Sequence, residues 1–185
     1  MASQQQSSKT PLHIRDRLRT PGYIFDFFDR KFSFDIDLCA EKGGNLCALY
    51  FDEETDGLAH RWPMYGGAGW CNPPFSSQEA WIRKAIYEGQ FGFVTVMLLP
   101  VFNGQAYWQL IADNATQIHN IIGRIAFLSP EDFVKSGGGD KPDIHFKEGD
   151  KLPGNTAGTC IVVFGGDILP MGFLSRDDMR KGEAE

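Results

Sequence analysis

The sequence lacks the features of membrane-spanning, zinc-binding and disulfide-rich proteins. No apolar run in its 185 residues approaches the roughly 20 residues needed to cross a bilayer. The first nine residues are polar and rich in Gln and Ser, unlike a signal or transit peptide. Its four cysteines form no CxxC pair and no zinc spacing with histidine. We therefore expect a cytoplasmic protein of one domain, with reduced thiols and no resident metal.

An overall excess of basic residues is also absent. The net charge is −6, with 18 Lys and Arg against 24 Asp and Glu, which argues mildly against a partner held chiefly through phosphates. Two local basic clusters remain, His13–Arg19 and Arg83-Lys84. Either cluster is equally well explained as solvated surface charge, so charge alone does not identify a partner.

The ends of the chain and one internal segment have the composition of irregular structure. We expect residues 1–10 to form a disordered tail and residues 175–185 a frayed, charged tail. Residues 130–153 are rich in glycine and charge and are predicted to form a mobile loop. A single domain should then occupy residues 11–174.

Strands and helices alternate within this domain. Thr20 is expected to cap a helix over 22–32 with Pro21 at its first position, and Ser76 or Ser77 to cap a helix over 78–88. A third helix is predicted over 106–113. Strands are predicted over 34–40, 70–71, 91–100, 118–128 and 159–164, with a helix or strand over 46–51. The alternation predicts an α/β fold with a mostly parallel sheet.

Asn72-Pro73-Pro74-Phe75 is the sharpest chemical signal, and it follows a predicted strand. Such a loop suits the methylation of an aromatic amine such as that of adenine. The lone pair of this amine is delocalised into the ring, which makes the nitrogen a poor nucleophile. Two acceptors aimed at its two N–H groups would localise the lone pair and stabilise the positive charge that develops during methyl transfer. The Asn72 side chain and the Pro73 carbonyl can supply these acceptors, on a turn that the prolines stiffen. Phe75 offers a surface on which a flipped base can stack. A plain turn is the competing interpretation, since Asn and Pro favour turns.

Two acids mark the end of an earlier predicted strand. Asp35 and Asp37 are two residues apart and would share a face of a regular strand. Ligands in parallel sheets bind beyond the carboxyl ends of the strands, so both are candidate ligand-binding residues, although either could serve only to cap a turn. A metal site is disfavoured because no third acid or histidine lies close to them in the sequence.

The whole pattern resembles the phage-type Dam DNA adenine-N6 methyltransferases. The resemblance runs from Thr20 to about Phe164. It depends on an ordered series of segments, namely Thr20-Pro21 with its aromatic helix, residues 34–40, 51–58, 70–76, the strand before Pro100, 123–127 and 158–164. The glycine-rich turn common in methyltransferases has only a loose counterpart after Asp37, and Phe75 stands where Tyr is common.

The resemblance implies a Rossmann-like methyltransferase domain, helices on both faces of the sheet, and S-adenosylmethionine as cofactor. It implies a bacterial host cell and a phage or prophage gene, and as partner double-stranded DNA with a flipped adenine. Asn72, Pro73, Pro74 and Phe75 would be catalytic. The cofactor would contact Thr20, Pro21, Asp35, Asp37, Ala40 and Asp56. DNA would contact Arg124, Arg83 and Lys84, with further recognition by residues 130–153 and the N-terminal arm.

Two alternatives stay open at this point. The same tetrapeptide chemistry suits a methyltransferase acting on the side-chain amide of a protein glutamine, and the negative net charge suits a protein partner. The loose glycine turn would also fit a catalytically silent module that keeps the fold and binds S-adenosylmethionine or DNA. The sequence leaves the target site and the oligomeric state open.

Overall fold

The computed structural model describes residues 10–101, 104–137, 141–153, 158–169 and 171–181. The predicted disordered tail over 1–10 falls almost entirely outside these residues. No described helix is long and apolar enough to span a membrane. All four cysteines are free thiols.

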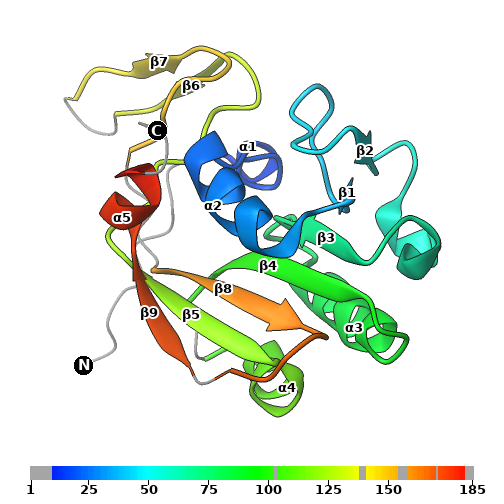
Figure 1. Cartoon of the computed structure of the whole chain (residues 1–185). Helices are drawn as coiled ribbons and strands as arrows, with labels where there is room; N and C mark the ends of the chain where they lie inside the picture. Colours follow the sequence, from blue (N-terminus) through cyan, green and yellow to red (C-terminus); the bar gives the residue numbers. More distant parts are fainter. Residues whose placement is uncertain (1–9, 102–103, 138–140, 154–157, 170, 182–185) are drawn as a thin grey trace.

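A seven-stranded sheet with helices on both faces forms the body of the protein (Figure 1). The strand order is β2-β1-β3-β4-β8-β5-β9, and β8 is the one strand of this sheet that runs antiparallel to its neighbours. The strands are β1 (Ile36–Asp37), β2 (Leu49–Tyr50), β3 (Ala68–Cys71), β4 (Val94–Pro100), β5 (Gln117–Ile122), β8 (Thr159–Phe164) and β9 (Gly172–Ser175). The predicted α/β class and mostly parallel sheet are confirmed.

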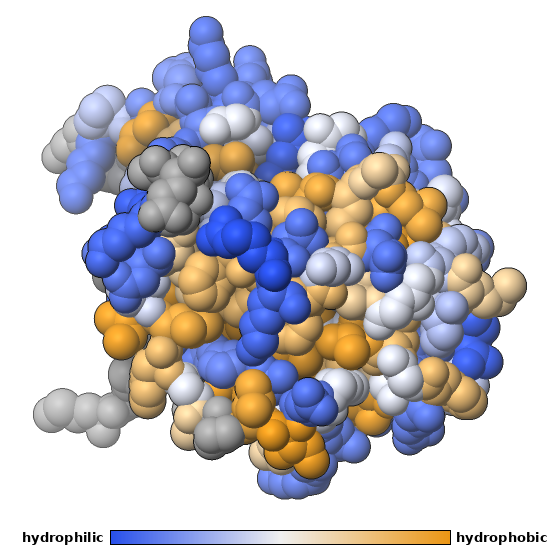
Figure 2. Space-filling model, in the orientation of Figure 1, coloured by the Kyte–Doolittle hydropathy of each residue, from blue (hydrophilic) through white to orange (hydrophobic). Residues whose placement is uncertain are grey.

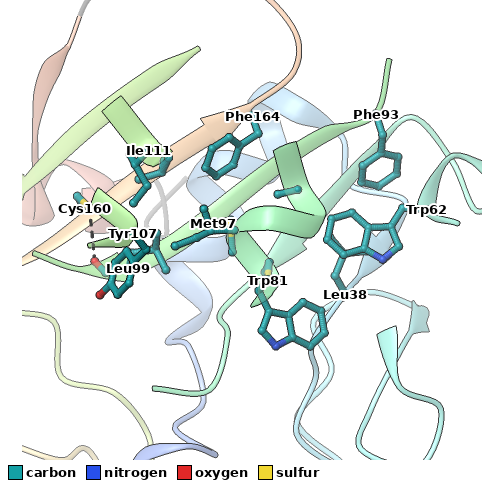
Figure 3. Close-up of a cluster of buried hydrophobic side chains, with 14 of the residues drawn as sticks. Leu38, Trp62, Trp81, Phe93, Met97, Leu99, Tyr107, Ile111, Cys160 and Phe164 are labelled. Carbon is teal, nitrogen blue, oxygen red and sulfur yellow. Dashed lines mark hydrogen bonds between the residues drawn. The ribbon is translucent and has the colours of Figure 1, made fainter. Parts of the chain in front are cut away.

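Alternating side chains of the central strands supply two separate cores. On β4, Met97 and Leu99 face a core with α3 (Gln78–Gly89) and α4 (Tyr107–Asn114), where the Cys160 thiol donates to the Leu99 carbonyl at 3.6 Å (Figure 3). Val96 and Leu98 face the opposite core, formed with α2 (Gly22–Phe32) and α5 (Arg176–Lys181). Because both faces of β4 are covered, its sequence is an unbroken apolar run.

Helix starts differ from the prediction by small but informative amounts. The first residue of α2 is Gly22, and Pro21 precedes it in an extended conformation (φ −62°, ψ 137°), so Thr20 does not cap this helix. Ser77 precedes α3, but its side chain makes no capping hydrogen bond. Short 3-10 helices, η1 (Gly57–Ala59) and η2 (Trp62–Met64), lie between β2 and β3.

Two segments predicted to be irregular contain regular structure among their described residues. Within 130–153, β6 (Phe133–Lys135) and β7 (Ile144–Phe146) form an antiparallel hairpin. The rings of Phe133 and Phe146 stack on each other, and Phe146 packs with Ile14 of α1 (Leu12–Arg15). Within the predicted tail over 175–185, α5 packs against α2 and buries Met179 (1% exposed). In both cases a few apolar side chains in a highly charged segment pack against a helix that is distant in the sequence, α1 for the hairpin and α2 for α5. Figure 1 shows the hairpin above the sheet beside α1.

Candidate active site

A cavity of about 620 Å³ lies at the carboxyl ends of β1 and β3. The chain passes from β1 to β2 on one side and then returns to β3 on the other, so the strand order reverses here. Ligands of open α/β sheets bind at such a reversal. Six residues singled out from the sequence line the cavity: Thr20, Asp37, Ala40, Asp56, Asn72 and Pro74.

The Asn72 side chain has a fixed orientation at the end of β3. Its amide Nδ2 donates to the Leu18 carbonyl at 2.7 Å. No described residue donates to its Oδ1, or to the carbonyl of Pro73, whereas the Pro74 carbonyl accepts the Ser77 N–H at 3.1 Å. The loop thus leaves two acceptor oxygens, those of Asn72 and Pro73, without a hydrogen bond to the described protein.

Phe75 and Pro73 lie away from this cavity. They border a small crevice over the carboxyl end of β4, together with Leu98, Leu99 and Pro100. Phe75 is half-buried there. Asn72 lines both the cavity and the crevice, and is therefore the residue at which the two spaces meet.

Asp37 is almost completely buried, with 3% of its surface exposed. Its carboxylate accepts the backbone N–H groups of Cys39 at 3.3 Å and Leu46 at 3.1 Å. Burial raises the pKa of Asp37 to about 6, against the lowering effect of these two hydrogen bonds. The side chain holds the loop after β1 through these hydrogen bonds. It also places at the wall of the cavity a carboxyl group that changes its charge near pH 6.

Besides Asp37, an acid that follows β2 lines the cavity, and it was not predicted from the sequence. Asp52 follows β2 and lines the cavity, as does Asp56. The Asp52 Oδ1 accepts the N–H groups of Glu54 and Thr55, each at 3.1 Å, and hydrogen bonding with Thr55 lowers the pKa of Asp52. Its position directly after a predicted apolar segment was the available signal, but the run of acids over 52–56 concealed it.

Two buried polar atoms of the cavity lining have no hydrogen-bond partner within the described chain. They are the Thr20 hydroxyl and the Trp70 indole Nε1. Buried polar groups are rarely left unsatisfied, so each of these atoms is expected to find a partner outside the described protein.

An ion-pair cluster forms the wall next to Asn72. Arg17 and Arg19 both contact Glu41, whose side chain is only 9% exposed. Arg17 also pairs with Glu131, and Arg19 with Glu148 at 2.7 Å, which ties the segment to the β6–β7 hairpin. The hydrogen bonds that Arg17 donates to Glu41 and Glu131 raise the pKa of Arg17, so its guanidinium stays charged. Sequence reasoning noted the basic segment but not its acidic partners, which are distant in the sequence.

Asp35 and Pro21 do not line the cavity. Asp35 lies before β1, at the amino edge of the sheet, where its Oδ2 accepts the N–H groups of Gly67 at 2.7 Å and Ala68 at 3.2 Å. A Cβ on Gly66, whose φ is +144°, would stand 2.3 Å from the Asp35 side chain. Asp35 therefore holds the glycine loop before β3, and the expected pairing of two acids at one strand end does not occur.

The basic pair on α3 also lies outside both the cavity and the crevice. Arg83 pairs with Glu79 one turn earlier, on the exposed side of the helix. Lys84 pairs at 2.7 Å with Glu88, which is fully buried and also contacts Arg61 at 3.1 Å. These contacts explain both side chains without DNA.

Arg124 lies beyond the end of β5, a strand parallel to β4, and so on the same edge of the sheet as Asn72. Its carbonyl accepts from Arg176 at 2.8 Å, and the residue is exposed. The part of the chain that the structure describes contains no cluster of three or more His, Cys, Asp or Glu side chains that could hold a metal.

Comparisons with known proteins agree on one family. The sequence matches the family described as DNA N-6-adenine-methyltransferase (Dam) over residues 7–180. It is 27% identical over 157 residues to the DNA N-6-adenine-methyltransferase of Escherichia phage T1, covering 76% of this chain and 66% of that protein, just under two thirds of its length. It is also 27% identical over 141 residues to the enzyme of the same name from Haemophilus phage HP1, covering 74% of this chain and 80% of that protein.

Proposed function

The chain belongs to the Dam family of DNA N-6-adenine-methyltransferases, and on this premise we propose that it transfers a methyl group from S-adenosylmethionine to adenine at Asn72. The observation that carries the assignment is the place of Asn72 between the cavity and the crevice. A methyl donor in the cavity would lie beside this side chain. The crevice has no room for a base in this structure, so a base would reach Asn72 from that side only when the crevice opens.

The residues around the cavity fit S-adenosylmethionine. A volume of about 620 Å³ is within the usual range for cofactor sites, roughly 300–1,000 Å³. Asp37 would face the cationic methionine end, and Asp52 and Asp56 would accept hydrogen bonds from the ribose hydroxyls. The Thr20 hydroxyl and the Trp70 indole, which lack partners in the described protein, would find them in the cofactor. When bound, the cofactor supplies a methyl group on a sulfonium, which is already an activated leaving group.

Asn72 and Pro73 would perform the chemistry by holding the amine. Their two free acceptor oxygens bind the two N–H groups of adenine N6, favour a tetrahedral nitrogen and stabilise the positive charge that develops on it. Phe75, which borders the crevice, would stack on the extruded base once the crevice opens to admit it. No residue need form a covalent intermediate, so the protein contributes alignment and electrostatic stabilisation.

We assign the sheet to the Rossmann-like methyltransferase class on two grounds. Four of the six strand pairings are parallel, namely those of β1 with β2 and β3, of β3 with β4, and of β5 with β9. The candidate site lies at the reversal of strand order between β1 and β3, where a nucleotide-like ligand is expected.

The hairpin is the best candidate for contact with duplex DNA. Its described carboxylates are engaged, because Glu131 and Glu148 pair with arginines and three aspartates, Asp132, Asp143 and Asp150, accept backbone N–H groups. By contrast, no described acid pairs with any of its lysines, which are Lys135, Lys141, Lys147 and Lys151. The surface there is mainly hydrophilic (Figure 2). Lysines in this state are suited to phosphates, and Arg124 extends the same edge of the molecule.

The proposal is tested by transfer of a labelled methyl group from S-adenosylmethionine to unmethylated genomic DNA, with wild type beside Asn72→Ala. Label on adenine N6 in the wild type alone, with cofactor binding retained in the variant, is the expected result. Label on a protein glutamine instead would move the substrate assignment to proteins. Cofactor binding without transfer to either would identify a silent module. The reaction belongs in the cytoplasm of a bacterial host, where its DNA substrate lies.

A further inference from the structure

The segment Asp16–Arg19, which we call the strap, contacts both ends of the proposed catalytic loop, which we define as residues 72–76. At one end the Leu18 carbonyl accepts the Asn72 amide N–H at 2.7 Å. At the other end the Asp16 Oδ1 accepts the backbone N–H of Ser76 at 3.0 Å. The strap is more than fifty residues from this loop in the sequence, so both contacts are tertiary.

The strap is itself firmly held. The N–H and C=O of Arg19 both bond to Leu128, at 3.1 and 2.9 Å, in an isolated antiparallel bridge. The guanidinium groups of Arg17 and Arg19 converge on Glu41, which is largely buried between them. A carbonyl fixed at both flanking residues can impose an orientation on a side chain that hydrogen-bonds to it.

We propose that the strap is the positioning element of the catalytic loop, and that the Leu18 carbonyl determines which atom of the Asn72 amide faces the substrate. This rests on the proposed function of Asn72. A carbonyl oxygen accepts only, so it must meet the NH₂ of the amide, and the Oδ1 is then turned to the adenine amine. The opposite orientation would set two oxygens against each other and present a second donor to the amine.

The proposal explains why an amide and not a carboxylate suits this position. A carboxylate at position 72 would be at least as good an acceptor for the amine. However, its other oxygen would face the Leu18 carbonyl with no proton between them, leaving an unsatisfied, repulsive pair of acceptors. Protonating that carboxyl would restore an O–H donor to Leu18 and a carbonyl acceptor to the amine. Asn72→Asp should therefore be a poor enzyme that improves when the pH falls.

The decisive experiment measures single-turnover methyl transfer by wild type, Asn72→Asp and Asn72→Ala between pH 5.5 and 8.5, with cofactor affinity measured in parallel. At pH 8 we expect Asn72→Asp to be about 10- to 100-fold slower than wild type, the equivalent of losing one hydrogen bond to a buried acceptor. Its rate divided by that of wild type should rise as the pH falls, while Asn72→Ala, which has no side-chain acceptor at any pH, should show no transfer across the whole range. The ratio cancels the titration of the unchanged groups that line the same cavity, among them His13, Asp16, Arg17, Arg19, Asp37 and Glu41.

Each outcome has a defined meaning. Full activity of Asn72→Asp at pH 8, or a loss that does not change with pH, would overturn the role of Leu18. Activity in Asn72→Ala would instead overturn the proposed function of Asn72.

The other end of the strap has its own matched pair of variants. Asp16→Asn keeps an oxygen for the Ser76 N–H and should retain the transfer rate, whereas Asp16→Ala should lower kcat with unchanged cofactor affinity. If the two variants behave alike, Asp16 does not position the loop. Melting temperatures of all variants separate loss of positioning from loss of folding.

Discussion

Asp35 and Asp37 are two residues apart, yet their carboxylates lie at opposite ends of β1 and do different work. Asp35 is exposed and binds the N–H groups of Gly67 and Ala68 at the amino edge of the sheet. Asp37 is buried at the carboxyl edge, beside the candidate cofactor cavity. A longer regular strand would have placed the side chains of residues 35 and 37 on one face of the sheet. Because β1 contains only Ile36 and Asp37, Asp35 lies outside the strand and this alignment does not arise.

The raised pKa of Asp37 predicts a pH-dependent stability. Its pKa is about 6 in the folded protein and 3.8 when unperturbed, so the folded state binds more protons between these values. The free energy of unfolding should therefore fall by about 2 kcal/mol from this group as the pH rises from about 4 to 6. Urea unfolding of wild type and Asp37→Asn across this range measures the effect, which should be missing from the variant. Parallel pH profiles for the two proteins would contradict it.

A cation bound in the cavity would lower the pKa of Asp37, which burial raises. S-adenosylmethionine carries positive charge, which favours the ionised form of a nearby acid. Cofactor binding near pH 6 should accordingly release protons, and affinity should weaken as the pH falls through 6. Calorimetry in two buffers of different ionisation enthalpy counts those protons. Asp37→Asn is the control, and an equal release from it would mean that another group is responsible.

The sequence was sufficient for the parts of the fold that local pattern determines. The apolar run over 159–164 matches β8 residue for residue, but nothing in such a run reveals that β8 is antiparallel. The strand expected over 118–128 ends at Ile122, because Gly123 adopts φ +93° and turns the chain. The hairpin within 130–153 was hidden because its strands have three residues each and pack against α1, which is distant in the sequence.

The candidate site shows the same division. Asn72 and its prolines could be proposed from the sequence because the proposed chemistry depends on four consecutive residues. Leu18, Glu41 and Asp52 could not, since their importance arises from long-range contacts or from a strand end hidden in an acidic run. The ion pair of Lys84 could not be predicted, because a basic pair in the sequence does not reveal that the acid one helical turn away is buried.

Lys84 should therefore matter for stability and not for DNA. Lys84→Ala leaves the fully buried Glu88 with Arg61 as its remaining cationic partner, which should cost about 3 kcal/mol of unfolding free energy. Arg83→Ala is the matched control, because its exposed pair with Glu79 is worth less than about 0.5 kcal/mol. Chemical denaturation measures both. A weaker salt dependence of DNA binding in Lys84→Ala would instead assign this lysine to DNA.

The carboxyl-terminal helix should contribute to the core. Met179 is 1% exposed and packs in the cluster that contains Phe28 and Ile121, so Met179→Ala should destabilise the protein by about 2–5 kcal/mol. Met64, which is 81% exposed, offers the same substitution without burial and should change stability by less than about 0.5 kcal/mol. Equal melting temperatures for the two variants would mean that α5 frays from the body.

Phe75 should act on the base more than on the fold. It is half-buried at the crevice, and loss of a stacking surface costs about 1–3 kcal/mol per base, so Phe75→Ala should lower kcat/KM by about 10- to 100-fold. Phe75→Tyr keeps the ring and should stay near wild type. Should the main effect of Phe75→Ala be a lower melting temperature, the ring belongs to the core and not to the base site.

The hairpin lysines give the sharpest test of how DNA is held, because the salt dependence of binding reports how many phosphates the protein neutralises. Each lysine that neutralises a phosphate steepens the fall of log affinity with log salt by about one. Changing to Gln the four lysines that no described acid pairs with (Lys135, Lys141, Lys147 and Lys151) should therefore flatten that slope by about one for each phosphate that is no longer neutralised. The rate of transfer at saturating DNA should persist, because the ion pairs of Arg17 and Arg19 with the hairpin are untouched. Arg83→Gln removes one charge elsewhere and should leave the slope unchanged. A slope that responds to Arg83 and not to the lysines would place the duplex over α3 and away from the hairpin.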